Sequence, residues 1–207
     1  MCKITCREEL DNGKRYRVRF NDEKFIEINA EDYFRLYLYE KESLTKEEYD
    51  HITEKIIFSQ AKKKAIDYIS FKKRTTGEVR KKLEESGFQG DIIDHTILYY
   101  EKEEYLDDEK YCEKFIAEKR KLKPCSKKEM VYMLSQKGVN DAIIQKAIEN
   151  AGIDETEVIK SIYNKKFKNA DLNNYKDTVK IMRYFANKRF EPESIENLIL
   201  YLKEGIT

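Results

Sequence analysis

Lysine and arginine occur in short clusters along this chain, and such clusters can bind a chain of phosphates or an acidic protein surface. The sequence has 41 Lys and Arg against 40 Asp and Glu, so any attraction must come from single segments. Residues 61–90 carry a net charge of +5 and residues 91–118 one of −7. The alternation continues with +6, −3, +6 and −3 over residues 119–137, 138–163, 164–189 and 190–207.

Lysine predominates in the basic segments, and it suits phosphates or acidic surfaces better than base edges. One alternative is that these cations are solvated helix faces paired with the acidic segments, because helix dipoles also place acids first and bases last. The cations that we predict to bind are Lys72, Lys73, Arg74, Arg80, Lys81, Lys82, Lys119, Arg120, Lys121, Lys127, Lys128, Lys165 and Lys166.

Aromatic residues could add base stacking to such a surface. The chain has 15 Tyr, 10 Phe and no Trp, and tyrosine rings can stack on single-stranded bases. Tyrosines also line the edges of packed helices, and we favour that interpretation. The residues concerned are Tyr99, Tyr100, Tyr105 and Tyr132.

Groups suited to catalysis are few. His51 and His95 have no nucleophile or carboxylate partner at a recognised spacing. Neither phosphate-binding glycine pattern, GxxxxGK[ST] or GxGxxG, is present. Asp107 and Asp108 could hold a divalent metal, but adjacent carboxylates at a helix start are better explained as a cap. We therefore predict no enzymatic activity, no cofactor and no metal.

The four cysteines lack CxxC spacing, so a zinc site would require the fold to bring distant thiols together. Reduced thiols are the simpler prediction for Cys2, Cys6, Cys112 and Cys125. Residues 1–9 show no apolar stretch of a secretory signal, and no segment approaches ~20 consecutive apolar residues. We expect a cytoplasmic protein with no membrane contact.

An apolar register repeats at an interval of 51 residues and identifies the elements that carry these side chains. A fixed register in three copies predicts one supersecondary unit used three times. The positions are Val79, Leu83, Phe88, Ile93, Ile97 and Tyr100, then Met130, Leu134, Val139, Ile144, Ile148 and Ala151, then Ile181, Phe185, Phe190, Ile195, Ile199 and Leu202.

Helix caps divide each repeat into three helices. Thr75 with Glu78 and Ser126 with Glu129 have the spacing of capping boxes before a middle helix. Gly87 and Gly138 follow the middle helices as expected for C-terminal caps. Early caps are predicted at Asp107 or Asp108 and at Asp154, and Pro192 suits the first turn of a last helix.

The N-terminal part has a different pattern. Residues 15–20 alternate charged and apolar side chains, residues 24–28 nearly do, and residues 3–9 supply a third candidate strand. Turns are predicted at residues 11–13 and at Asn21-Asp22. A helix over residues 30–40 and a second one capped by Thr45 should follow.

The predicted fold is mainly α: three tandem three-helix repeats in an elongated array, preceded by a small antiparallel β-meander. Stacked repeats need no partner subunit, so we expect a monomer. The expected domains are residues 1–60 (meander plus helices), 61–106 (first repeat), 107–153 (second repeat) and 154–207 (third repeat).

Several segments resemble the RecX family of regulatory proteins. The similarity is good over residues 61–153, and in the third repeat it consists of the apolar register alone. The segments that carry it are residues 65–70, 74–83, 105–108 and 111–115 in one block, and residues 127–130, Leu134 and residues 137–139 in a second.

The resemblance implies three tandem three-helix units without enzymatic activity, which bind the RecA recombinase filament on single-stranded DNA. It further implies restraint of strand exchange and ATP hydrolysis, in DNA recombination, repair and the SOS response, by binding in the filament groove. The chain departs from the family at Cys112 and Cys125 and in its lysine-rich basic segments. Two alternatives are a helical-repeat protein that binds single-stranded nucleic acid alone, and a protein-interaction scaffold unrelated to RecA.

Overall fold

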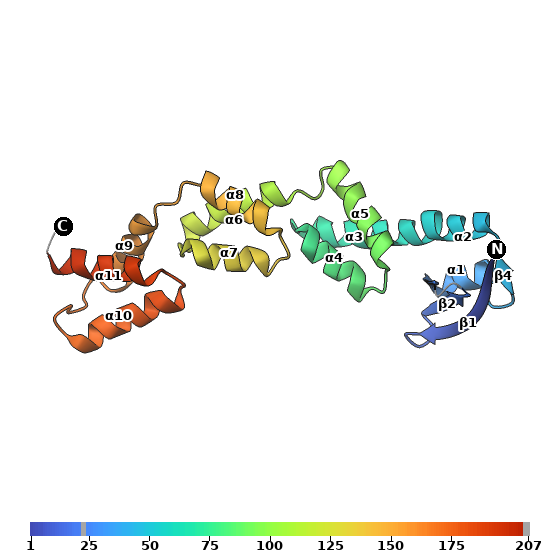
Figure 1. Ribbon diagram of the computed structural model, residues 1–207, viewed down its shortest axis with the longest axis horizontal. Coiled ribbons are helices and arrows are strands. Elements are labelled where there is room, and N and C mark those ends of the chain that lie inside the picture. Colours follow the sequence, from blue (N-terminus) through green and yellow to red (C-terminus); the bar gives the residue numbers. More distant parts are fainter. Residues whose placement is uncertain (22–23, 205–207) are drawn as a thin grey trace. The chain divides into compact units, whose positions relative to one another are not determined.

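The computed structural model describes residues 1–21 and 24–204 (Figure 1). The chain forms two compact units, Met1–Leu106 and Asp107–Thr207. The first holds the N-terminal sheet and the first helical repeat, and the second holds the other two repeats.

The sheet consists of β1 (Cys2–Leu10), β2 (Arg15–Phe20), β3 (Phe25–Asn29) and β4 (Ser43–Leu44) in the order β3-β2-β1-β4. All neighbours are antiparallel, with Glu8 opposite Arg17 and Arg17 opposite Glu27. The three predicted strands are confirmed. The two-residue strand β4 was not predicted, because so short a segment has no periodic pattern.

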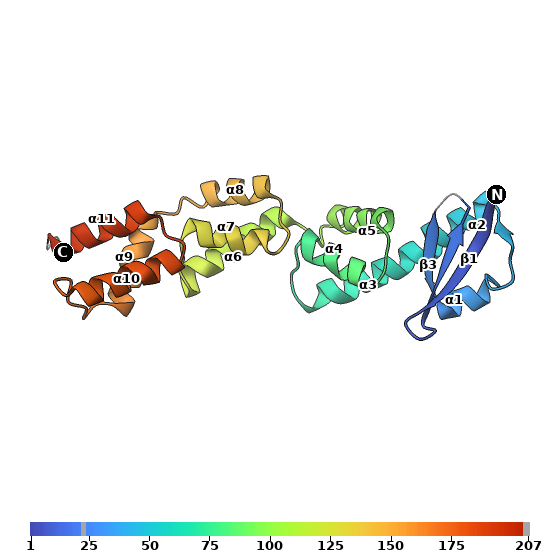
Figure 2. The same ribbon diagram turned by 60° about the horizontal axis from the view of Figure 1, so that its bottom comes forward.

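The first predicted turn is confirmed, with Asp11, Asn12 and Gly13 all at positive φ. Short polar residues and glycine tolerate that conformation best. The second predicted turn, at Asn21-Asp22, extends outside the described residues. Strands β1 and β3 lie on either side of β2, and Figure 2 shows these strands beside the long helix that follows them.

Two helices follow the sheet. Asn29 caps α1 (Ala30–Arg35) by accepting from the Asp32 N–H, and Thr45 forms a capping box with Glu48 before α2 (Lys46–His51). The helix predicted over residues 30–40 ends early, because Tyr37 adopts a left-handed φ of 56°. A left-handed residue cannot continue a right-handed helix.

Helix α2 continues without a break through the π-helical turn η1 (Ile52–Ile57) into α3 (Phe58–Phe71). The residues between Lys46 and Phe71 include no Gly or Pro that would stop a helix. The expected domain boundary at residue 60 thus lies within α3. A single core joins the sheet and the first repeat, with Val18 and Ile28 in the same cluster as Val79 and Leu83.

The first repeat consists of α3, α4 (Thr76–Glu85) and α5 (Gly90–Lys102). The capping box of Thr75 and Glu78 is confirmed. Gly87 follows α4 at a φ of +84°, the left-handed conformation that glycine adopts at little cost.

The second unit contains α6 (Asp108–Leu122), α7 (Lys127–Ser135) and α8 (Asp141–Asn150), then α9 (Glu155–Lys166), α10 (Tyr175–Asn187) and α11 (Pro192–Lys203). Asp107, Ser126 and Asp154 cap α6, α7 and α9 with their side chains, as predicted. Each triplet of helices has its own apolar core.

The apolar register of the three repeats is confirmed as the core. Phe88, Ala151 and Leu202 are partly buried, and the other positions of the register are buried. The repeated spacing therefore reports packing, and the remaining side chains are available for other roles.

Candidate polyanion-binding surface

The predicted cations of the first repeat differ in how exposed and how engaged they are. The Arg74 side chain is only 16% exposed, and its guanidinium lies 4.0 Å from the centre of the Tyr68 ring. It also lies 3.6 Å from a carboxylate oxygen of Glu78, the residue that completes the capping box. Arg74 therefore stabilises the start of α4 and has little surface for a ligand.

The middle helix of the first repeat carries three predicted cations. Arg80 pairs with Asp94 of α5, and the Lys82 ammonium lies 3.9 Å from Glu85. Lys81 is exposed and has no ion pair among the residues that the structure describes. Lys72 and Lys73, at the end of α3, are also exposed.

The second repeat uses most of its predicted cations in contacts within its own unit. Arg120 donates to the carbonyl of Ala151 (3.0 Å) and so satisfies the end of α8. Lys128 pairs with Glu191 of the third repeat at 2.6 Å. The Lys119 ammonium lies 5.3 Å from the ring of Phe115.

Two predicted cations of the second repeat lie at the ends of helices. The backbone N–H of Lys127 donates to Glu155 (2.9 Å). Lys121, near the end of α6, is exposed and has no ion pair within residues 1–21 and 24–204. A cation near a helix C-terminus also interacts favourably with the helix dipole.

Exposed apolar residues accompany the cations at the ends of α3 and α6. Phe71 is 87% exposed and Leu122 is 61% exposed, and the two are 51 residues apart. Lys72 follows the first and Lys123 the second. This repeated pair was not predicted, although an apolar side chain next to lysines at a helix end is a signal visible in the sequence.

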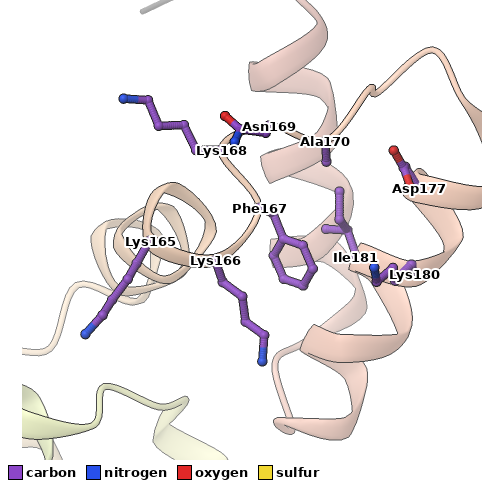
Figure 3. A pocket seen from close by; sticks show the side chains of 9 residues that line it. All are labelled: Lys165, Lys166, Phe167, Lys168, Asn169, Ala170, Asp177, Lys180 and Ile181. Atoms are coloured by element: carbon purple, nitrogen blue, oxygen red, sulfur yellow. The ribbon is translucent and has the colours of Figure 1, made fainter.

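The third repeat gathers the most exposed cations. Lys165 and Lys166 end α9, and the following loop forms a hollow of about 320 Å³ against α10 (Figure 3). Figure 3 shows Phe167 pointing towards Ile181 of α10, while Lys165 and Lys168 extend away from that ring. The Lys166 ammonium lies 4.2 Å from the ring of Tyr184. The loop is thus anchored by an aromatic ring and carries lysines around it.

A second hollow of about 500 Å³ lies along α10 itself. Lys176, Lys180, Arg183 and Asn187 follow a spacing of four, three and four, which places them on one helix face. All four line this hollow, together with Tyr175, whose residue is 81% exposed. Lys180 also lines the first hollow, so its side chain is shared by the two.

These side chains form what we call the third-repeat basic face, defined as Lys165, Lys166, Lys168, Lys176, Lys180 and Arg183. Within the described part of the chain, none of the six has an ion pair. Asp177 is the carboxylate at this face, and one of its oxygens accepts from the backbone N–H of Asp171 (3.2 Å). The arrangement suits a chain of phosphates, since lysines act as point charges towards phosphate oxygens.

Two members of this face were predicted from the sequence, and four were not. Lys165 and Lys166 stood in a visible pair, whereas Lys168, Lys176, Lys180 and Arg183 are dispersed in the sequence. The signal was present in the charge of +6 over residues 164–189 and in the helical spacing of the last three.

The tyrosines considered for stacking take part mainly in helix packing. Tyr100 is buried, and its hydroxyl donates to the carbonyl of Lys62 (2.9 Å). Tyr99 and Tyr105 contact Tyr100 edge to face, and Tyr132 lies 3.8 Å below the guanidinium of Arg189. This supports the packing interpretation.

In residues 1–21 and 24–204 no three His, Cys, Asp or Glu side chains come together as a metal site would require. All four cysteines are free thiols. Burial, with a smaller contribution from Asp108 and Glu109, raises the pKa of Cys112 to about 11. No helix in the described part of the chain is both long and apolar enough to span a bilayer.

The first and second repeats match the models of a known protein family. The model of the first three-helix domain of RecX matches residues 61–99, and that of the second matches residues 107–148. These ranges coincide with the helices α3 to α5 and α6 to α8.

Relatives align along nearly the whole chain. A regulatory protein RecX from Caldanaerobacter subterraneus subsp. tengcongensis is 28% identical over 191 residues, covering 91% of this chain and 94% of that protein. One from Clostridium botulinum strain Alaska E43 is 28% identical over 206 residues, covering 96% and 95%.

Solved structures share the fold. The crystal structure of a regulatory protein RecX superposes with a TM-score of 0.61 at 18% identity, covering 95% of this chain and 98% of that one. RecX from Lactobacillus salivarius gives a TM-score of 0.57 at 22% identity over 70% of this chain and 96% of that one. The matched domains, the full-length relatives and the shared fold together show that the chain belongs to the RecX family of regulatory proteins.

Proposed function

We propose that this protein binds the RecA filament on single-stranded DNA and restrains its recombinase and ATPase activities. Family membership is the observation that carries the proposal, because the full-length relatives are named regulatory proteins RecX. The protein would act in the cytoplasm without chemistry of its own, through the contacts that its repeats make. It would do so as a monomer, because each unit completes its own apolar core.

The charge pattern supports contact with a nucleoprotein filament. The third-repeat basic face offers six cations without ion pairs in the described chain, and a filament on single-stranded DNA presents phosphates and acidic protein groups. Lys72, Lys81 and Lys121 add exposed cations in the first two repeats. We propose that these three lysines and the third-repeat basic face, which includes Lys165 and Lys166, make the electrostatic contacts with the filament. Four other predicted cations are engaged in contacts within or between the repeats, and these contacts are their main role: Arg74, Arg80, Arg120 and Lys128.

A second function, binding of single-stranded nucleic acid without RecA, is favoured by one specific observation. Tyr175 is exposed beside Lys176 and Lys180, and an aromatic ring among cations can stack on a base. Under this alternative, the protein would bind bare single strands as tightly as it binds the filament.

RecA-dependent ATP hydrolysis on single-stranded DNA tests the proposal directly. Added protein should lower the rate of hydrolysis, and the double variant Lys180→Glu and Arg183→Glu should need a higher concentration for the same effect. A matched control reverses two exposed lysines of the first unit, Lys3→Glu and Lys46→Glu, and changes the net charge equally.

Three results are decisive. Hydrolysis unaffected by the unmodified protein would reject the proposed function. Equal weakening by both double variants would show a general charge effect and reject the assignment to the third-repeat basic face. Equal affinity for bare single strands and for the filament would favour the alternative function.

A further inference from the structure

A cluster of exposed aromatic side chains lies in the last turn of helix α1 and in the segment that follows it, in the first unit. Phe34 is 51% exposed, Tyr37 is 56% exposed and Tyr39 is 45% exposed. Their ring centroids lie 5.9 Å apart for Phe34 and Tyr39 and 6.0 Å apart for Tyr37 and Tyr39. We call these three residues the aromatic face. Exposed aromatic rings that contact one another typically mark an interaction site.

The aromatic face rests on a firm support. The rings of Tyr16 and Tyr33 stack in parallel, with centroids 4.0 Å apart. Phe34 meets both of them edge to face, at 5.5 and 5.3 Å. Because Tyr16 belongs to β2 and Tyr33 is buried, Phe34 connects the exposed rings to the sheet.

The backbone of this segment is held in a strained form. Tyr37 has a φ of 56°, a conformation that costs a residue other than glycine about 1–2 kcal/mol. Arg7 of β1 holds the segment in place, since its guanidinium donates to the carbonyls of Leu38 (2.8 Å) and Lys41. Asn or Gly at position 37 would remove the strain. A tyrosine at such a position points to a use for its exposed ring.

On residues 30–42, the segment that carries the aromatic face, the charges without an ion pair are negative. Three carboxylates on the same segment are exposed and have no ion pair in the described part of the chain: Glu31, Glu40 and Glu42. The two cations of the segment are engaged, Arg35 with Asp32 and Lys41 with Glu48. Two cations of the sheet also lie beside this segment: Arg7 donates to the carbonyls of Leu38 and Lys41, and the carbonyl of Lys14 accepts from the N–H of Ala30.

This combination selects one kind of partner. Single-stranded nucleic acid also stacks on aromatic rings, but it needs cations for its phosphates and here would meet carboxylates. A protein surface with arginine or lysine among apolar side chains complements both the rings and the acidic rim. Tyrosine is also among the residues that contribute most to protein interfaces.

We propose that the aromatic face docks on a basic, partly apolar surface of a RecA protomer in the filament. The inference rests on the proposed function and adds to it a contact with protein, distinct from the electrostatic contact of the third-repeat basic face. The two surfaces have opposite charge and lie in different units of the chain, so each can be changed without touching the other.

The test measures the affinity of the full-length protein for RecA filaments on single-stranded DNA and, separately, for bare single-stranded DNA. The variant is Phe34→Ser, Tyr37→Asn and Tyr39→Ser, in which Asn suits the left-handed position 37. We expect its filament affinity to fall about tenfold or more, with affinity for bare DNA unchanged. The matched control Leu200→Ser removes an apolar side chain of similar exposure, 57%, and should change neither affinity.

A second variant keeps the rings and the fold, because it changes the exposed rim alone. Glu40→Lys with Glu42→Lys should also weaken filament binding, and more strongly at low salt, because it sets like charges against the basic partner. Amide exchange in β1 and β2 shows whether either variant disturbs the sheet.

Several results would overturn the proposal. Filament affinity within twofold of the unmodified protein in both variants would show that the face is not used. An equal loss of affinity for bare DNA would show that the rings stack on bases. Self-association of the unmodified protein that the aromatic variant abolishes would identify a second copy as the occupant. If the unmodified protein fails to bind filaments at all, the proposed function falls, and this inference falls with it.

Discussion

Replacing Gly87 with alanine should weaken the contact between the N-terminal sheet and the first repeat. Gly87 has a φ of +84°, and an added Cβ would lie 1.7 Å from Nη1 of Arg15 and 2.5 Å from a carboxylate oxygen of Glu27. That Nη1 donates to the carbonyl of Ser86 (2.6 Å) and to Glu27 (3.1 Å). The guanidinium of Arg15 therefore occupies the space that a side chain at position 87 would need.

Two contributions set the size of the effect. Alanine in the left-handed conformation costs about 1 kcal/mol relative to glycine. The displaced guanidinium also gives up hydrogen bonds from a charged donor, which contribute about 1.5–3 kcal/mol. We expect Gly87→Ala to lower the free energy of unfolding of the first unit by about 2–4 kcal/mol in total.

Two other glycines supply controls. Gly152 has a φ of +53° and nothing within 4 Å of an added Cβ, so Gly152→Ala in the second unit should cost only the backbone contribution, about 1 kcal/mol. Gly90 is in α5, has no positive φ, and likewise has open space around it. Gly90→Ala should therefore change stability little.

Urea unfolding followed by amide exchange of peptides from β2, β3 and α4 measures the effect. The decisive step is the double variant Arg15→Ala and Gly87→Ala: without the guanidinium, the alanine at position 87 should cost only about 1 kcal/mol more than Arg15→Ala alone. Additive losses in the double variant would refute the reasoning, because they would show that Arg15 and position 87 do not compete for the same space.

Three further predictions concern the second unit. In a double-mutant cycle of Arg189→Ala with Tyr132→Ala, we expect a coupling of about 0.5–1 kcal/mol from their contact at 3.8 Å, and no coupling would contradict a joint between the repeats. Folding raises the pKa of the Cys112 thiol to about 11, against 9.0 for a free thiol, so unfolding releases a proton between these two values. The free energy of unfolding should therefore fall with rising pH by about 1.4 kcal/mol per pH unit more than it does in Cys112→Ala. Urea melts of both proteins between about pH 8 and pH 11 check the difference, and equal slopes would contradict it. Replacing Lys180 and Arg183 with Gln should reduce the slope of log affinity for single-stranded DNA against log salt by about 1.4, and an unchanged slope would mean that these residues touch no phosphate.

The core of the repeats could be predicted from sequence because its signal is local. Helical spacing places Met130 and Leu134 on one face, and the interval of 51 residues repeats that face at Val79 and Ile181. Caps are equally local: the hydroxyl of Thr75 accepts from an N–H three residues on. Such features depend on neighbours in the sequence, so the fold followed from them.

The binding cations could not be predicted with the same success, because their partners are distant in sequence. Arg80 and Lys81 are adjacent and look alike in the sequence, yet Arg80 pairs with Asp94 while Lys81 stays exposed. The clustering of charge was informative about segments. Which individual cation stays free depends on tertiary contacts that no short pattern encodes, as the pair of Lys128 and Glu191 shows.

One position in the turn after each middle helix serves two different contacts between neighbouring elements. Gly87, Gly138 and Arg189 are spaced by 51 residues, and all three have a positive φ, of 84°, 72° and 60°. In the first repeat the missing side chain makes room for Arg15 of the preceding sheet. In the third repeat the position itself carries an arginine, which accepts the cost of a left-handed conformation.

That arginine extends back to the preceding repeat. The Arg189 side chain lies 3.0 Å from a carboxylate oxygen of Glu129 and over the ring of Tyr132, while the carbonyl of the adjacent Lys188 accepts from the hydroxyl of Ser126 (2.8 Å). In both cases an arginine at this turn joins a repeat to the element that precedes it in the chain. In the first repeat this is Arg15 of the preceding sheet, and in the third it is Arg189 of the repeat itself. The turn that ends the middle helix therefore joins the first repeat to the sheet and the third repeat to the second, and the exposed face of α10 takes no part in either contact.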